Sequence, residues 1–165
     1  MKKNRKLFFA ATALVFPIAH AAEPPELKEG LWSIRIQMTN NPGGKTEDST
    51  SLLCRNHAYD KSAINLAKDV KKNCSKYDEN FQGGKYTTDM HCTVAGSAID
   101  TKGTATYSGD TSAHAENHTT YSPAFGGVTD STMIMDQKYV GSCPAGAQPG
   151  DRINADGSIL HTGRH

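Results

Sequence analysis

The sequence has no hydrophobic run long enough to cross a membrane. Its longest apolar stretch, LFFAATALVF, begins at Leu7 and ends at Phe16, whereas a transmembrane helix needs roughly 20 apolar residues. Cysteine is also absent before Cys54, so the N-terminal segment has no thiol that could carry a lipid anchor. We therefore expect no membrane span once a leader has been removed.

The motifs of several enzyme and metal-site classes are missing. There is no C-x-x-C pair for a zinc or redox site, no G-x-S-x-G turn of a hydrolase and no H-E-x-x-H helix of a metalloprotease. The triplets GGK at 43–45 and 83–85 lack the rest of a phosphate-binding loop. No two carboxylates are arranged for general acid and base catalysis. The sequence therefore predicts a protein that is not an enzyme and has no cofactor.

An excess of basic charge is missing as well. The chain has 18 Lys and Arg residues against 17 Asp and Glu residues, and four of the basic ones precede the apolar stretch. The remainder is mildly acidic, which excludes nucleic acid as a partner because its phosphates bind clustered basic side chains.

The first residues are typical of a secretory signal peptide. A basic start, MKKNRK, is followed by the apolar stretch and by the small-residue cleavage site AHA, which ends at Ala21. We expect residues 1–21 to be the signal peptide, with cleavage near Ala21. The mature protein is then periplasmic or secreted.

Four cysteines follow the leader: Cys54, Cys74, Cys92 and Cys143. An even number in an oxidising compartment indicates two disulfides, for which three pairings exist. Gly83-Gly84 predicts a hairpin that places Phe81 opposite Tyr86. In that register Cys92 lies one residue from Cys74, an offset that a bulge can absorb. The hairpin therefore favours a Cys74–Cys92 bridge and leaves Cys54–Cys143 as the long-range one.

Most of the mature chain has the pattern of antiparallel strands. The segment LWSIRIQM alternates, with Trp32, Ile34, Ile36 and Met38 on one face, and we expect Trp32 in the core. Further strands are expected at 50–54 and, at short intervals, near 85–94, 97–107, 112–121 and 131–140.

One amphipathic helix is expected from Asn56 to about Lys72. Its apolar positions recur at helical spacing, and three lysines gather at its C-terminal end, where the helix dipole favours cations. These lysines leave a membrane-surface role open as a minor alternative. The apolar residues of the expected face are Tyr59, Ala63, Leu66, Ala67 and Val70, and the lysines are Lys68, Lys71 and Lys72.

Together these elements predict a mainly β fold with one helix. We expect a meandering antiparallel sheet that is curled into a half-barrel or small barrel around the helix and cross-linked by two disulfides. The modest apolar fraction favours a packed interior over a ligand cavity. The expected domains are a single β-rich domain at 22–151 and a C-terminal tail at 152–165, in which DRINADGS forms a turn between Ile153 and Ile159 rather than a calcium loop.

The segment SAHAENHTTY is the one candidate for a metal site. On a strand, His114, Glu116 and His118 share a face, so two imidazoles and a carboxylate could bind one ion. His161 and His165 in the tail could add ligands. The alternative is an unligated polar strand face, which the sequence favours because solvent-facing strands are rich in such residues.

Short motifs in a fixed order give the chain a resemblance to a family. GLW at 30–32, the cysteines at 54, 74 and 92, and YVGSCP at 139–144 resemble domain-of-unknown-function family 3617, over roughly residues 24–151. The resemblance implies a small bacterial envelope protein with no assigned activity, catalytic residues or cofactor. The polar hairpin NNPGGK stands where relatives often carry methionine-rich segments.

The sequence thus predicts an exported, soluble envelope protein that acts as a non-catalytic binding or interaction module. Its partner would be an unknown protein or small ligand of the cell envelope. The alternative is a metal-binding periplasmic protein that uses the His114, Glu116 and His118 face.

Overall fold

The computed structural model describes residues 23–162, without the side chains at 66–68 and 70. The expected signal peptide at 1–21 and His165 of the tail lie outside this range. So do the side chains of Leu66, Ala67, Lys68 and Val70, which belong to the expected faces of the helix. Within the described range, no helix is both long and apolar enough to cross a membrane.

Residues 23–162 fold into nine strands and one helix. The strands are β1 (Gly30–Asn41), β2 (Lys45–Arg55), β3 (Cys74–Gln82), β4 (Lys85–Val94), β5 (Ser97–Ser108), β6 (Ser112–Phe125), β7 (Val128–Gly141), β8 (Arg152–Ile153) and β9 (Ile159–Leu160), and the helix is α1 (His57–Lys71). The expected strands and the helix are all present, so the mainly β fold is confirmed.

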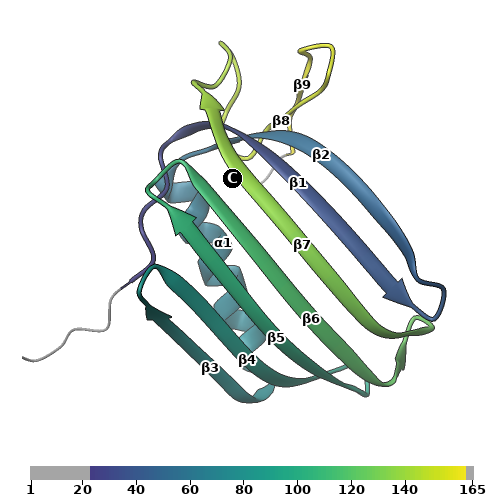
Figure 1. Ribbon diagram of the computed structural model, residues 1–165. Coiled ribbons are helices and arrows are strands. Elements are labelled where there is room, and N and C mark those ends of the chain that lie inside the picture. The colour runs from purple at the N-terminus through teal and green to yellow at the C-terminus, as the bar shows by residue number, and fades with distance from the viewer. Residues whose placement is uncertain (1–22, 163–165) are drawn as a thin grey trace, which may run out of the picture.

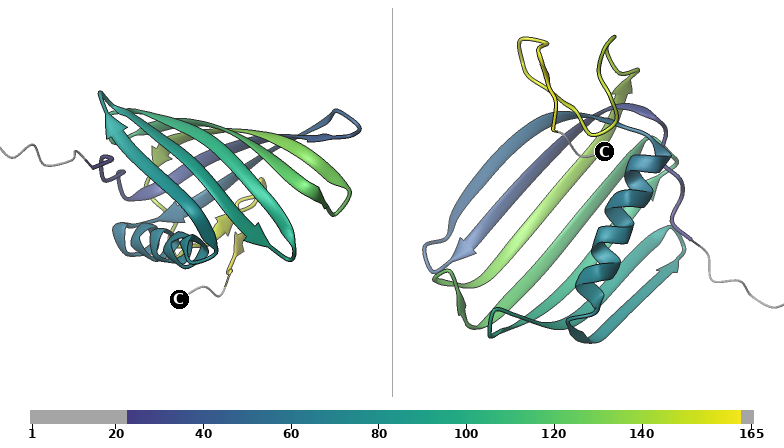
Figure 2. Two further views of the ribbon diagram at one scale, coloured as in Figure 1. Left: turned by 90° about the horizontal axis from the view of Figure 1, so that it is seen from below. Right: turned by 180° about the vertical axis from the view of Figure 1, so that it is seen from behind.

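All strands form one antiparallel sheet in the order β3-β4-β5-β6-β7-β1-β2-β8-β9 (Figure 1). Strands β3 to β7 form the expected meander, and β7 then pairs with β1 rather than ending the sheet. The sheet does not close, so the half-barrel is the observed alternative. Because β2 and β3 lie far apart in the sheet, α1 carries the chain from one side to the other across one face (Figure 2).

The hairpin between β3 and β4 has the predicted register. Gly83 and Gly84 both have positive φ, as a tight turn of this kind requires, and Phe81 pairs with Tyr86. A shift in register after Cys74 brings it directly opposite Cys92. The bulge therefore absorbs the one-residue offset.

Both predicted disulfides are present. Cys74 and Cys92 are bonded, with Cα atoms 3.8 Å apart, and Cys54 and Cys143 are bonded, with Cα atoms 5.6 Å apart. Cys54 lies on β2 and Cys143 follows β7, whereas β1 runs between these strands. The long-range bridge therefore ties together the two neighbours of β1.

Helix α1 begins at a side-chain cap. Oδ1 of Asn56 accepts a hydrogen bond of 2.8 Å from the backbone N–H of Tyr59, which satisfies a free donor of the first turn. At the other end, Nζ of Lys71 lies 2.5 Å from Oε2 of Glu79 on β3. Figure 2 shows the helix on the inner side of the curved sheet.

Trp32 is the centre of a small core at one end of β1. Its side chain is fully buried, and Nε1 donates a hydrogen bond of 2.8 Å to the backbone carbonyl of Lys28. The ring of Tyr139 meets it edge-on at 6.0 Å, and the Arg55 guanidinium lies 5.0 Å from its ring centre. The expectation that Trp32 is a core residue is confirmed.

Residues 152–160, assigned by the sequence to a tail, add a short hairpin to the sheet. Strand β8 pairs with Leu52 and Leu53 of β2, and Ile153 pairs with Ile159 as the predicted turn requires. Asp151, just before β8, is buried and accepts hydrogen bonds from the backbone N–H of Gln148 and from His161.

Candidate functional site

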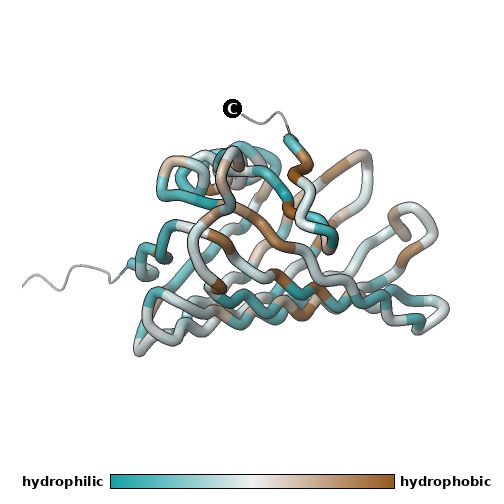
Figure 3. The backbone as a smooth tube through the Cα atoms, turned by 90° about the horizontal axis from the view of Figure 1, so that it is seen from above, coloured by the Kyte–Doolittle hydropathy of each residue, from teal (hydrophilic) through white to brown (hydrophobic). Residues whose placement is uncertain are grey.

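The strand registers divide the long strands into two faces of opposite character. On β1, Trp32, Ile34, Ile36 and Met38 share one face, and the residues paired with them continue that face across the sheet. We call it the concave face, because Glu79, which lies on it by register, binds helix α1 on the inner side of the curve (Figure 2). Figure 3 shows brown and teal segments alternating along the sheet, as two unlike faces require.

The concave face carries most of the large apolar side chains of the sheet. Besides those of β1 and the disulfide Cys74–Cys92, the set comprises Tyr77, Phe81, Tyr86, Met90, Ile99, Tyr107, Tyr121, Met133, Met135 and Tyr139. The opposite, convex face carries mainly threonine and charged residues. The alternation predicted for β1 from the sequence therefore extends over the whole sheet.

Helix α1 covers only part of the concave face. Figure 2 shows it in front of the side formed by β4 and β5, whereas most of β7, β1 and β2 is clear of it. Accordingly, Ile34 and Ile36 on β1 and Met133 and Met135 on β7 are only half-buried. The expectation of a packed interior does not hold for this part of the sheet, because one 15-residue helix is too narrow to cover seven long strands.

Small residues line the middle of the concave face. Ala113 and Ala115 on β6 are buried, and Ala105 lies opposite Ala115 on β5. Gly103 continues this set, and a Cβ atom there would clash with Oδ1 of Asn117 and would lie 2.6 Å from Oγ1 of Thr88, so a larger residue would displace these side chains. This band of small residues separates the aromatic side chains near α1 from the aliphatic and methionine side chains of β7 and β1.

Arg55 closes one end of the concave face. Its guanidinium lies 2.9 Å from Oδ1 of Asp60 on α1 and donates a hydrogen bond of 2.8 Å to Oε1 of Gln137 on β7. Because of this ion pair, Asp60 neutralises the charge of Arg55. Burial raises the pKa of the nearby Tyr107 phenol, and the positive charge of Arg55 opposes that shift.

Glu79 holds the other end of the helix to the sheet. Its carboxylate accepts hydrogen bonds from Lys71, Tyr77 and Tyr86. Burial alone would raise the pKa of Glu79, but the hydrogen bonds from Lys71 and the two tyrosines together lower it. Burial, followed by the hydrogen bond to Glu79, raises the pKa of Tyr77 to about 12. Glu79 therefore stays ionised and paired.

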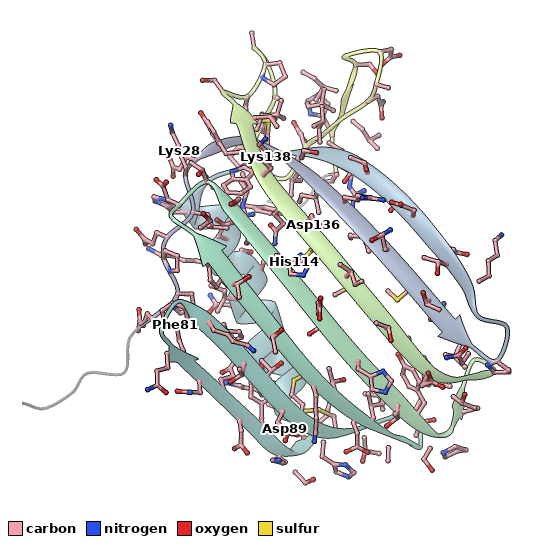
Figure 4. All side chains as sticks on the ribbon, viewed as in Figure 1. Lys28, Phe81, Asp89, His114, Asp136 and Lys138 are labelled. Carbon is pink, nitrogen blue, oxygen red and sulfur yellow. A yellow bond between two sulfur atoms is a disulfide. The ribbon has the colours of Figure 1, made fainter. Side chains whose placement is uncertain are left out.

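The predicted metal ligands lie on the convex face, away from the helix. His114 lies beside Asp136 (Figure 4), with Nδ1 2.7 Å from Oδ1 of Asp136. Its Nε2 lies 3.2 Å from Oε1 of Glu116. His118 instead contacts Oγ1 of Thr132. The structure thus brings His114 and Glu116 together and leaves His118 apart. Among residues 23–162, no three His, Cys, Asp or Glu side chains are grouped so that they could hold a metal ion.

Asp136 is the partner of His114 that sequence reasoning missed. It lies directly opposite His114 on β7, and the two side chains line a shallow depression with Arg35 and Lys138. The hydrogen bond to Asp136, followed by that to Glu116, raises the pKa of His114. Both ring nitrogens therefore face carboxylates, which favours a protonated imidazolium over a metal ligand.

A comparison with protein-family models confirms the family resemblance inferred from the sequence. The family model described as protein of unknown function, DUF3617, matches residues 27–143. The chain belongs to the DUF3617 family. A search of curated proteins gives no match. The matched segment of this DUF3617 protein begins next to Lys28, whose carbonyl accepts the hydrogen bond from Trp32. It ends at Cys143, the second cysteine of the long-range bridge.

The concave face of the DUF3617 protein offers, at its centre, an apolar surface with neutral polar groups. Its two ion pairs, Arg55–Asp60 and Lys71–Glu79, link α1 to the sheet ends rather than standing free. The remaining polar groups near the centre are amides and hydroxyls, such as Asn117 and Thr88. The sequence signal for this face was the parity of the apolar residues on each strand, but the exposure of the face depends on the position of α1.

Proposed function

We propose that the protein is an exported, non-catalytic binding protein of the bacterial envelope, and that its concave face binds a neutral, mostly apolar ligand. The proposal rests on half-buried apolar side chains that lie together on β1 and β7. Ile34, Ile36, Met133 and Met135 lie side by side on a face that α1 leaves uncovered. Soluble proteins rarely leave such a contiguous surface without a binding partner.

The charge of the concave face supports a neutral ligand. The cations Arg55 and Lys71 are each within 3 Å of a carboxylate and are therefore already neutralised. A charged ligand at the centre of the face would have to displace one of these pairs, and breaking a partly buried pair is costly. Lys45 and Glu47 also lie on this face by register, but near the β1–β2 turn rather than at its centre. An uncharged apolar ligand only has to displace water from the aliphatic side chains, which is favourable by about 25 cal/mol for each Å² buried.

The residues present also support a role without catalysis. Near the middle of the concave face the polar groups are the amide of Asn117 and threonine hydroxyls, which bind but do not move protons readily at neutral pH. The perturbed carboxylate, Glu79, is held by three donors that keep it ionised. A binding surface requires no more than these groups.

Export is supported by the N-terminal segment, which is typical of a signal peptide, and by the disulfide bonding of the cysteines. All four cysteines are paired in disulfides, which form and persist in oxidising compartments. With cleavage after Ala21, the exported protein begins at Ala22. N-terminal sequencing of the protein recovered from the periplasm checks this, and an uncleaved protein in the cytoplasm would contradict export.

A fluorescent apolar probe tests the binding surface. N-phenyl-1-naphthylamine is neutral, and we expect it to bind residues 22–165 saturably. Ile36 on β1 lies on the concave face, whereas Ile134 on β7 lies on the convex face next to it, and both are half-buried. Ile36→Glu should weaken probe binding by about tenfold or more, because a carboxylate resists transfer to an apolar contact. Ile134→Glu is the matched control and should bind as the parent does.

The milder variant Ile36→Thr distinguishes a loss of binding from a folding defect. It retains the β-branched shape suited to a strand but has less apolar surface, so it should weaken binding in a protein with a normal circular dichroism spectrum. Absence of saturable binding by the parent, or equal binding by the Ile36 and Ile134 variants, would overturn the proposal.

A further inference from the structure

All methionines among the described residues lie on the concave face. The sequence contains five methionines, and the four after Met1 are Met38, Met90, Met133 and Met135. Met38 pairs directly with Met133 across β1 and β7, and Met135 is the next residue of β7 on the same face. Met90 lies apart on β4. Three of the four therefore form one group, which we call the methionine cluster.

The register brings the three side chains of the methionine cluster within reach of one point. Directly opposed residues of antiparallel strands have Cβ atoms about 4.5–5.5 Å apart, and diagonal neighbours such as Met38 and Met135 lie about 7–8 Å apart. A methionine side chain is unbranched and has three rotatable bonds, so its sulfur can move over this range. All three are half-buried, on the part of the sheet that α1 does not cover. An ion from solvent can reach them.

From this geometry we propose that Met38, Met133 and Met135 form a binding site for a soft monovalent cation, Cu(I) or Ag(I). Thioether sulfur is a soft ligand that selects such ions over hard ones. The competing soft ligand, cysteine thiolate, is absent because all four cysteines are in disulfides. The thioethers are therefore the soft donors that this protein offers in an oxidising compartment.

The charged neighbours of the methionine cluster disfavour a hard divalent cation. Glu47 on β2 lies opposite Met38, and Lys45 occupies the next position of that face toward the hairpin turn. A single carboxylate beside a lysine is far from the six to eight oxygen ligands that Ca²⁺ takes. Binding at this place depends on the sulfur atoms, and Glu47 can offset the single charge of the ion.

This site goes beyond the proposed binding of an apolar ligand, and leucine substitutions test it without removing apolar surface. Leucine resembles methionine in volume and hydrophobicity, and such exchanges are well tolerated. The triple variant Met38→Leu/Met133→Leu/Met135→Leu keeps the apolar surface and removes every thioether of the cluster. Its circular dichroism spectrum and its melting temperature should match those of the parent, so that a loss of Ag(I) affinity reports on the sulfur atoms.

Titration with Ag(I), which needs no reductant, tests the site. In residues 22–165 with the disulfides intact and methionine methyl groups labelled with ¹³C, we expect one Ag(I) to bind. The methyl signals of Met38, Met133 and Met135 should shift together, while that of Met90 should not. The triple leucine variant should bind Ag(I) about 100-fold or more weakly, and Met90→Leu, the matched control, should bind as the parent does.

Three results would overturn the site: no Ag(I) binding by the parent, equal shifts of all four methyl signals, or unchanged Ag(I) affinity in the triple variant. Normal Ag(I) binding without probe binding would instead reject the apolar ligand alone. Loss of Ag(I) affinity in the triple variant together with a changed circular dichroism spectrum would be resolved by the double variant Met38→Leu/Met133→Leu. That variant should retain the fold and still lose Ag(I) affinity, and normal affinity in it would overturn the site.

Discussion

His114 is a residue for which the sequence and the structure indicate different partners. In the sequence it alternates with Glu116 and His118, a spacing that fits both a metal site and a polar strand face. In the structure its two ring nitrogens face Asp136 and Glu116, whereas His118 turns to Thr132. The decisive partner, Asp136, comes from another strand, and nothing in the local spacing points to it.

The raised pKa of His114 leads to a prediction about pH. The hydrogen bonds to Asp136 and Glu116 favour the charged imidazolium, so its titration midpoint should lie above the ordinary value of about 6.5. A group whose pKa is raised by folding stabilises the fold at pH values below its unfolded pKa. That contribution is lost as the pH rises through the folded pKa.

NMR titration of the His114 ring measures the midpoint directly. Asp136→Asn should lower it toward the ordinary value, because the first cause of the shift is removed. Asp100→Asn is the matched control, since Asp100 bonds His91 on the neighbouring strands and not His114. A midpoint of His114 that is the same in the parent and in Asp136→Asn would contradict the assigned cause.

At the level of elements, the hairpin registers were predictable where the turn was tight and regular. Gly83-Gly84 determined the pairing of β3 with β4, and the bulge after Cys74 completed it. The hairpin of β6 and β7 differs. Phe125 pairs with Val128 next to the Gly126-Gly127 turn, but Thr120 already pairs with Asp130. Five residues of β6 thus match two of β7.

This irregularity decides which residues share a face. Without it, a regular hairpin from Gly126-Gly127 would place His114 opposite Tyr139, whereas the observed register places it opposite Asp136. An odd shift of register exchanges the two faces of a strand relative to its neighbour. The bulge therefore brings Ala115 opposite Met135 on the concave face, and the turn sequence alone does not reveal it.

At the scale of the whole molecule, the bridge between Cys54 and Cys143 should contribute strongly to the stability of the fold. The two residues are 89 positions apart, and closing a loop of that size should contribute about 4.6 kcal/mol by the loop-entropy model. The shorter loop of Cys74–Cys92 should contribute about 3 kcal/mol. We expect Cys54→Ala/Cys143→Ala to lower the melting temperature by about 10 °C.

Thermal unfolding of the two double variants checks the order of these effects. Cys74→Ala/Cys92→Ala, the comparison variant, should lower the melting temperature by less, because its separation is only 18 residues. A larger loss on removing the short bridge would contradict the loop-entropy argument. Both cysteines of each pair are replaced together so that no free thiol remains to mispair.

The sequence by itself determined the local structure of this protein: the strand positions, the single helix, the β3–β4 register and both disulfide pairs. These follow from side-chain periodicity, turn residues and cysteine spacing, which act between near neighbours or through covalent chemistry. Only the tertiary structure decided that β7 pairs with β1, that the sheet stays open, and that α1 covers one side of the concave face. Those outcomes depend on contacts between segments far apart in the chain, and they leave Met38, Met133 and Met135 together and within reach of solvent.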